Sequence, residues 1–485
     1  MAAASGWQLT GIAIRPSKPD LPQKPLQQPN RPCMHLVPGD HHYIKSASEQ
    51  THPTTPITIR SPSSTAMAPQ LDPLLLLLLL AASLLALARP ASCAADPVLF
   101  PVAKDPATSL YTIPIRDGAN HLVDLAGPLL WSTCASDHLP APFSCNSTAC
   151  RHANAYSAPT CRIAGHPCSR SRRQCKAFPY NPLTGRCAAA SLVHTRLVAN
   201  TTDGRNPLSQ VSVRAVGACA PRALLAPLPK DVAGVAGLAD AGLALPAQVA
   251  VSHRVANRFL LCLPRRGEGV AVFGEGPFFL RLFLDPETSS GDLTSTLVFT
   301  PLRARKGNPL YYLPVQGVAV NQAQVPLPAD ALATGGVVLC TRVPYTALRP
   351  DVYRPLVDAF DRALARDDAK VPAVAPFDLC YRSSMLGNTR LGYAVPDVTL
   401  MLEGGRNWTF VGSSSMVDVN GQTACLAFVE MRGVKPGDPS FAAVVVGGFQ
   451  MEDHLLQFDL EKQQLGFAKV PVISACSNFN FTKSQ

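Results

Sequence analysis

The sequence predicts a mainly β protein built of two similar lobes, on three observations. Much of the chain consists of short apolar or alternating runs, such as 297–300, separated by Gly, Pro, Asn and Asp, a pattern typical of strands joined by turns. A turn segment with apolar flanks occurs twice, at 121–131 and 335–345. An apolar-apolar-Gly segment follows each turn, at 234–238 and at 444–448. The repeated plan indicates two lobes of the same construction.

Three further segments complete the expected secondary structure. The run 458–468 has apolar residues on both sides of a polar turn, which predicts a closing hairpin near the C-terminus. Residues 351–364 place three apolar side chains on one stripe, which predicts a helix after the second turn segment. The stretch 245–249 has a proline near its start, where proline favours the first turn of a helix.

Composition divides the 485 residues into four segments. Residues 1–66 are rich in Pro, Ser, Thr and His and lack apolar periodicity, which predicts a disordered or non-native extension. Within 67–95, a Leu and Ala run at 74–88 is followed by small residues, the pattern of a secretory signal peptide. That run is too short to span a bilayer comfortably. The rest is expected to form an N-terminal β lobe, 96–295, and a C-terminal β lobe, 296–485.

Cysteine content agrees with passage through an oxidising compartment. Cys33 and Cys93 precede the expected mature chain, which keeps 13 of the 15 cysteines. Because 13 is odd, one thiol remains if the others pair, and Cys340 is the candidate because of its place in the second turn segment. Seven of the 13 lie between Cys134 and Cys187, which predicts a loop-rich region held by disulfides. Zinc is the alternative, but no Cys-x-x-Cys pair with matched His spacing supports it.

The chain is basic, with 43 Lys and Arg against 33 Asp and Glu and a net charge of +10. In a secreted protein this charge favours an acidic wall polymer or an anionic enzyme cleft as partner. No basic run alternates with aromatic residues, so we expect no nucleic-acid partner. Four acceptor sequons for N-glycosylation fit the secretory route, at Asn146, Asn200, Asn407 and Asn480.

The two turn segments differ in the residue that would carry chemistry. The first holds Asp124, whereas the second holds Cys340, followed closely by Arg342. Peptide hydrolysis by an acid pair needs two carboxyl groups a few ångströms apart that share one proton. A thiol cannot take that part, because its reference pKa is about 8.5 and it donates hydrogen bonds weakly. No catalytic pair is therefore intact, and we expect Asp124 to be a vestigial, buried turn aspartate that accepts backbone N–H bonds.

Taken in order, the turn segments, the apolar-Gly segments and the closing hairpin resemble the two-lobed pepsin-like aspartic protease fold, which has a few short helices. Over 96–476 the sequence is more specifically similar to the TAXI-type xylanase inhibitors, a plant family related to nepenthesin-like proteases and basic seven-S globulins. That resemblance implies two β-rich lobes, six disulfides and no proteolysis. It is carried by the stretches 123–128, 192–204, 235–239, 254–264 and 416–419.

The same resemblance implies plant defence, with a fungal or bacterial glycoside hydrolase of the endo-xylanase type as the protein partner. Members of the family place a histidine, from a loop after the final hairpin, between the two catalytic carboxylates of a xylanase, where an imidazolium gains charge-assisted hydrogen bonds. Val472 stands at that position and offers neither charge nor donor. A second family contact, a leucine, corresponds to Arg390, with Leu391 one place along. These three residues are the expected inhibitory contacts.

Two other functions stay open. The fold alone suggests an aspartic-type endopeptidase, but Cys340 in place of the second acid argues against that function. A basic seven-S globulin-like protein would instead bind a peptide or carbohydrate, or serve for storage, without blocking an enzyme. Arg390 either reaches an acidic enzyme cleft or is a solvated loop arginine. We expect a secreted, extracellular or cell-wall monomer with no cofactor, no metal site and, after signal removal, no membrane attachment.

Overall fold

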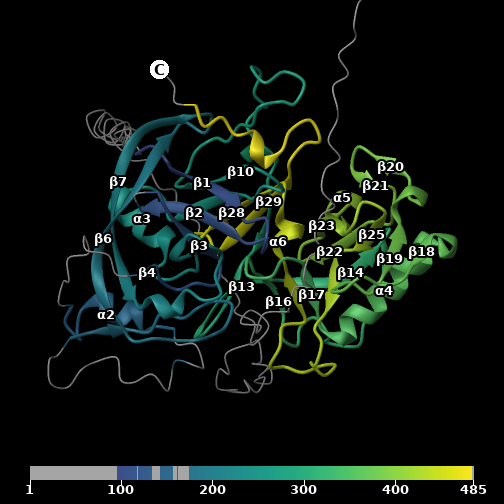
Figure 1. Ribbon diagram of the computed structural model, residues 1–485, viewed down its shortest axis with the longest axis horizontal. Coiled ribbons are helices and arrows are strands. Elements are labelled where there is room, and N and C mark those ends of the chain that lie inside the picture. Colours follow the sequence, from purple (N-terminus) through teal and green to yellow (C-terminus); the bar gives the residue numbers. More distant parts are fainter. Residues whose placement is uncertain (1–94, 117, 134–142, 157–160, 162–173, 483–485) are drawn as a thin grey trace, which may run out of the picture.

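One 13-stranded sheet builds the first part of the chain and takes in its last two strands (Figure 1). Its order is β11-β29-β28-β9-β10-β1-β2-β3-β8-β4-β7-β6-β5, and β6 pairs with β1 as well. The strands are β1 Val98–Lys104, β2 Tyr111–Arg116, β3 Ala119–Asp124, β4 Trp131–Thr133, β5 Lys176–Ala177, β6 Ala190–Thr202, β7 Pro207–Ala220, β8 Val232–Gly237, β9 Arg258–Cys262, β10 Glu268–Phe273, β11 Val298–Pro301, β28 His454–Asp459 and β29 Gln464–Lys469.

Smaller sheets make up the rest of the C-terminal half. They are a six-stranded sheet, β12-β13-β16-β27-β17-β26, two four-stranded sheets, β15-β14-β22-β23 and β18-β19-β25-β24, and the pair β20-β21. The strands are β12 Arg303–Arg305, β13 Asn308–Leu313, β14 Val315–Val320, β15 Ala323–Gln324, β16 Val337–Leu339, β17 Thr346–Leu348, β18 Lys370–Val371, β19 Cys380–Arg382, β20 Asn388–Thr389, β21 Gly392–Tyr393, β22 Val398–Leu402, β23 Arg406–Phe410, β24 Met416–Asp418, β25 Thr423–Leu426, β26 Phe428–Glu430 and β27 Val444–Val446.

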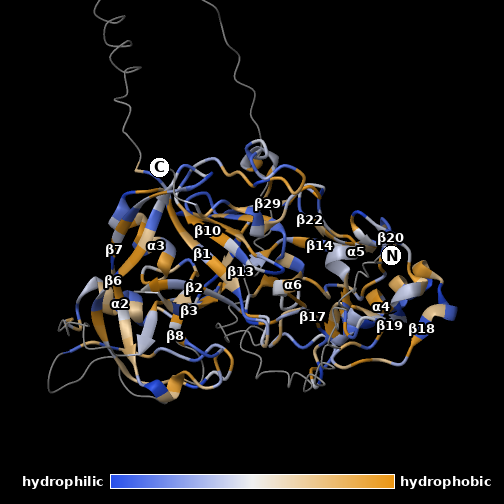
Figure 2. Cartoon of the chain, turned by 45° about the horizontal axis from the view of Figure 1, so that its top comes forward, coloured by the Kyte–Doolittle hydropathy of each residue, from blue (hydrophilic) through white to orange (hydrophobic). Residues whose placement is uncertain are grey.

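The predicted mainly β, two-lobed fold is confirmed. This computed structural model describes residues 95–482 apart from 117, 134–142, 157–160 and 162–173. The expected extension, 1–66, and all but the last residue of the expected signal peptide, 67–95, lie outside the described residues. Apolar residues are frequent on inner strands of the large sheet, such as β1 and β10 (Figure 2), and most of them are buried, so their burial favours folding.

Helices are few and short, as expected. The α-helices of the described residues are α2 Thr148–Ala153, α3 Leu245–His253, α4 Pro350–Leu364, α5 Gly412–Ser415 and α6 Gly448–Met451. The predicted helices correspond to α3 and α4, and both have a proline in the first turn. Along α4 the buried face carries Val352, Leu356 and Phe360. In the described part of the chain, no helix combines the length and the apolar character needed to cross a membrane.

The two turn segments have the same strand pairing in the two lobes. β3, which ends at Asp124, pairs in parallel with β8 of the first apolar-Gly segment. β16, which leads into Cys340, pairs in parallel with β27 of the second. The closing hairpin is formed by β28 and β29, and β28 also pairs with β9. Each turn segment is therefore fixed at the end of a buried strand.

Disulfides confirm the prediction of an oxidised, stapled chain. Four bridges join pairs of described cysteines: Cys150–Cys175, Cys161–Cys187, Cys262–Cys476 and Cys380–Cys425. Cys340 is disulfide-bonded as well, so the expectation that it is the odd free thiol is wrong. That expectation combined an odd number of cysteines with the place of Cys340 in the second turn, and neither carries information on which cysteine lies beside another.

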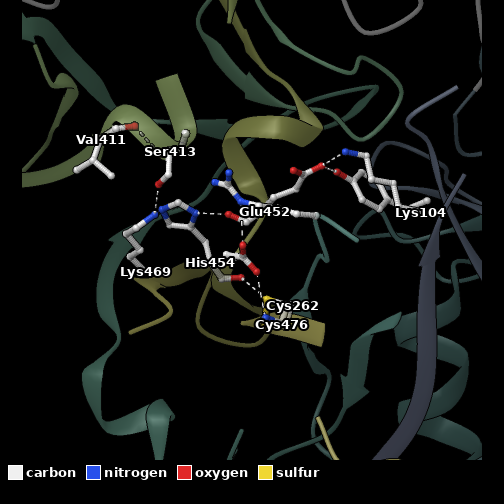
Figure 3. A network of polar contacts seen from close by, with 12 residues as sticks. Lys104, Cys262, Val411, Ser413, Glu452, His454, Lys469 and Cys476 are labelled. Carbon is white, nitrogen blue, oxygen red and sulfur yellow. Dashed lines mark hydrogen bonds and ion pairs between the residues drawn. A yellow bond between two sulfur atoms is a disulfide. The ribbon is translucent and has the colours of Figure 1, made fainter. Parts of the chain in front are cut away.

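A buried polar network joins the large sheet to the segment between α6 and β28 (Figure 3). The Glu452 carboxylate accepts from Lys104 Nζ at 2.5 Å and from Tyr111 Oη at 2.7 Å. His454 Nδ1 lies 2.9 Å from the Glu452 carbonyl oxygen, so it carries the proton and donates. Its Nε2 has no hydrogen-bond partner in the structure. Burial, together with the charge of Lys469, lowers the pKa of His454 to about 3.

We expect His454 to contribute to acid unfolding. Its ordinary pKa is about 6.5, so between pH 6.5 and 3 the unfolded chain binds the proton that the folded chain refuses. The free energy of unfolding should fall by about 1.4 kcal/mol for each pH unit as the pH drops through that window. Urea unfolding at pH 7 and pH 4 should show a smaller loss for His454→Gln than for the parent protein.

Comparing His454→Gln with the parent protein separates the contribution of His454 to the pH dependence of stability from that of Glu452. Burial raises the pKa of Glu452, and a carboxyl whose pKa is raised on folding changes stability with pH in the opposite sense. An equal loss of stability in His454→Gln and parent would contradict a neutral buried His454.

Candidate functional site

A buried ion pair lies where the two turn segments meet. Arg342 Nε donates to Asp124 Oδ1 at 2.6 Å, and a terminal nitrogen of the same guanidinium donates to Oδ2 at 2.8 Å. Both side chains are at most 3% exposed. A two-point contact of this kind engages both carboxylate oxygens and fixes the planes of the two groups. Asp124 Oδ1 also accepts the Ala126 N–H at 3.1 Å.

Tyr180 completes the cluster from the N-terminal half of the chain. Its hydroxyl accepts from the Arg342 guanidinium at 2.5 Å. Burial raises the pKa of Tyr180 to about 12, although the guanidinium acts against the shift. The pKa of Arg342 is raised as well, because Asp124 and Tyr180 more than offset the effect of burial. The cluster therefore holds a charged Arg342, its carboxylate partner and a neutral phenol.

Backbone packing leaves Asp124 little freedom to leave this pair. Its carbonyl oxygen accepts from Gly127 N at 3.0 Å and from Leu238 N at 2.8 Å. A Cβ atom on Gly237 would lie 2.2 Å from the Gly127 carbonyl oxygen, so this close approach requires glycine. The apolar-Gly segment thus holds the first turn in place.

A hydroxyl from the second turn links the two lobes on one side. Thr341 Oγ1 donates to the Val123 carbonyl oxygen at 2.8 Å and accepts from Leu125 N at 3.2 Å. Leu125 holds the matching position in the first turn and has no hydroxyl to return the contact. Thr341 therefore places the residue after it, Arg342, directly above Asp124.

This arrangement does not supply the chemistry of an acid pair. The described hydrogen bonds of the Asp124 carboxylate go to Arg342 and to a backbone N–H, and none goes to a second carboxyl group. The matching position of the second turn is held by Cys340, which is buried and disulfide-bonded. The chemistry of an acid pair needs a second carboxyl group within reach of the first, and the described contacts of Asp124 place the Arg342 guanidinium there instead.

The three expected inhibitory contacts lie on two separate exposed loops. Val472 is 44% exposed in the turn that follows β29. Arg390 and Leu391 form the tip between β20 and β21, where Arg390 is exposed and Leu391 is 42% exposed. None of these side chains contributes to the Asp124 cluster. Val472, Arg390 and Leu391 are exposed, whereas Asp124 is buried.

Sequence reasoning noted Arg342 but missed its contact with Asp124, and it missed Tyr180 altogether. The signal available for the contact between Arg342 and Asp124 was the positive charge of Arg342, two residues after Cys340 at the broken acid position. Tyr180 lies in a cysteine-rich loop with no local pattern that would single it out. The metal alternative gains no support, since the described residues contain no cluster of potential ligands.

Comparison with known proteins supplies the family. The xylanase inhibitor N-terminal family matches residues 111–275, and the xylanase inhibitor C-terminal family matches residues 310–469. The chain belongs to the TAXI-type xylanase-inhibitor family. This member is 50% identical over 398 residues to a rice protein named chitinase CLP (Oryza sativa subsp. japonica), covering 80% of this chain and 92% of the rice protein.

Similar solved structures agree with this assignment. The crystal structure of edgp superimposes with a TM-score of 0.70 at 30% identity and covers 80% of this chain and 99% of that one. Basic 7S globulin from soybean gives a TM-score of 0.65 at 28% identity, with coverage of 79% and 98%. These neighbours have the pepsin-like fold, so this TAXI-type chain is a pepsin-like protein whose acid pair is broken.

Removing one member of the ion pair should destabilise the protein strongly. Arg342→Met leaves a buried, uncompensated Asp124 carboxylate, which costs about 3–5 kcal/mol. The double replacement Asp124→Asn with Arg342→Met removes both charges and keeps an oxygen for the Ala126 N–H, so most of the loss should be recovered. Urea unfolding of the two variants and the parent measures both effects.

A surface arginine provides the control for that experiment. Arg354 is 70% exposed and pairs with Glu430, so Arg354→Met should change the free energy of unfolding by less than about 0.5 kcal/mol. A loss in Arg342→Met no larger than in Arg354→Met would contradict the importance of the buried pair.

Proposed function

We propose that this TAXI-type chain is a secreted, non-catalytic inhibitor of a microbial cell-wall-degrading glycoside hydrolase of the endo-xylanase type. It acts outside the plant cell, in the wall, as a monomer in plant defence. The observation that carries the proposal is the two-point contact of Arg342 with Asp124. It takes the remaining catalytic carboxylate out of use and leaves a protease-shaped protein whose exposed loops can bind.

Proteolysis is the first alternative, and the cluster argues against it. Asp124 would have to leave Arg342 inside a buried site, and Cys340 would still offer no acid. We therefore expect no cleavage of a denatured protein substrate at acidic pH, with or without pepstatin. Cleavage that pepstatin abolishes would reverse the assignment, and a pepsin-like protease assayed in parallel shows that the assay detects such activity.

The loop after β29 gives a sharper test of inhibition. Val472 stands where family members carry a histidine, and its exposed isopropyl group cannot bridge two carboxylates. Val472→His should lower the inhibition constant for a xylanase at least tenfold, because an imidazolium gains charge-assisted hydrogen bonds there. Steady-state inhibition kinetics measure the change.

The neighbouring residue supplies the matched control. Ile473 is exposed to a similar degree, at 47%, and Ile473→His adds the same group one place along. Equal effects of the two replacements would show that charge alone matters and would contradict the placement of Val472 at the contact.

The target is identified by titrating the protein against xylanases, glucanases and chitinases. Saturable loss of activity in one class supports the inhibitor proposal. No change in any rate would favour the third possibility, a binding or storage protein of the basic seven-S globulin kind. That outcome would not affect the argument against proteolysis, which depends on the broken acid pair.

Chitin hydrolysis is a second candidate, favoured by the 50% identity to the rice protein named a chitinase. Glycoside hydrolysis ordinarily needs two carboxyl groups about 5–9.5 Å apart across the scissile bond, and Asp124 cannot be one of them. Incubating the protein alone with chitin tests this candidate. Release of soluble sugar by both the parent and Asp124→Asn would favour it and locate the site elsewhere on the chain.

A further inference from the structure

The hairpin of β6 and β7 carries two arginines directly opposite each other on its exposed face. Arg196 pairs with Arg214 in the register of the two strands, and both side chains are exposed. Residues on the other face, such as Leu197 and Val213, are buried in the core. The hairpin lies at the outer margin of the N-terminal lobe (Figure 1).

The hydrogen-bond pattern brings these two side chains close. Arg214 N donates to Ser252 Oγ of α3 at 3.0 Å, so it does not donate across to Arg196. The two arginines are therefore a non-hydrogen-bonded pair, in which Cβ atoms lie about 4.5–5.5 Å apart and side chains are nearest. Like charges placed directly opposite each other destabilise a strand pair.

The described residues do not neutralise this pair. Neither arginine forms an ion pair with any described carboxylate. Between residues 190 and 220 the sequence has one acidic residue, Asp203. Its carboxylate accepts from two backbone N–H groups in the turn at the end of the hairpin. An anionic ligand would therefore relieve a repulsion that is built into the sheet.

An aromatic pair lies next to the arginines. His194 is exposed and precedes Arg196 by two residues on the same face of β6, and its ring lies 4.9 Å from the ring of Phe143. Flat rings provide apolar area at low entropic cost. Paired cations beside an aromatic surface suit a ligand that has carboxylates along a chain of rings.

We propose that the face formed by His194, Arg196 and Arg214 binds a polyuronate, a wall polymer of sugars that carry carboxylates. Each guanidinium can receive a carboxylate through two parallel hydrogen bonds, and the aromatic pair packs against a sugar ring. The inference goes beyond the inhibitor function, because it uses none of the loops assigned to an enzyme partner. Binding of a polyuronate at this face holds the protein in the cell wall whether or not a hydrolase is bound.

Binding of the full secreted chain to immobilised polygalacturonate tests the proposal. The variant Arg196→Gln with Arg214→Gln should bind at least tenfold more weakly, and binding of the parent should weaken as salt is raised. The matched control is Arg354→Gln with Arg366→Gln, which changes the net charge equally at arginines already paired with Glu430 and Asp368. The control should bind like the parent, and thermal unfolding verifies that both variants are folded.

Two further ligands separate sugar from charge. Methyl-esterified polygalacturonate has the same backbone without the charges and should bind at least tenfold more weakly than the acid form. Polyglutamate carries carboxylates without sugar rings and should also bind more weakly than the acid form. His194→Ser should weaken the binding of polygalacturonate and leave the binding of polyglutamate unchanged. Equal loss in the two double variants, or equal affinity for polyglutamate, would overturn the proposal in favour of bulk charge or an acidic polypeptide.

Discussion

The contact between Asp124 and Arg342 organises the centre of this protein. It joins the end of β3 to the segment after β16, so the carboxylate that would act in catalysis becomes a structural link between the two lobes. Taking both charges out of water is costly, and only excellent geometry with further hydrogen bonds offsets that cost. Tyr180 and the Ala126 N–H supply those bonds, and Thr341 places Arg342 above its partner.

Because the acid pair is broken, the exposed surface loops are the candidate sites of function. Function depends on particular sites and not on the fold that carries them. The loop that bears Val472 is held at both ends. Before Val472, Val470 N donates to the Asp453 carbonyl oxygen at 2.9 Å. After it, Ser474 Oγ donates to the Arg281 carbonyl oxygen at 2.7 Å and Cys476 is bridged to Cys262. A side chain at position 472 is therefore displayed on a fixed backbone, which limits the entropy lost on binding.

Local patterns predicted the framework well and the contacts between distant residues poorly. The turn segments, the apolar-Gly strands, the closing hairpin and α4 were all predicted, because apolar periodicity and turn residues act over short spans. Asp124 and Arg342 were both singled out, but they lie 218 positions apart, and no spacing rule pairs residues at that distance. Predicting that the two arginines of β6 and β7 lie opposite each other requires the register of the strands. Predicting that Cys340 is disulfide-bonded requires knowing which cysteine lies beside it, and a count of cysteines does not give that.

The path of the large sheet has a consequence for biosynthesis. β28 lies beside β9, yet 191 residues of chain separate Cys262 from His454. At roughly 5–20 residues per second, ribosomes take on the order of ten to forty seconds to make that stretch. During this interval the edge of β9 has no strand to pair with and can recruit a foreign one. Newly made chains thus depend on protection of this edge until the final hairpin emerges.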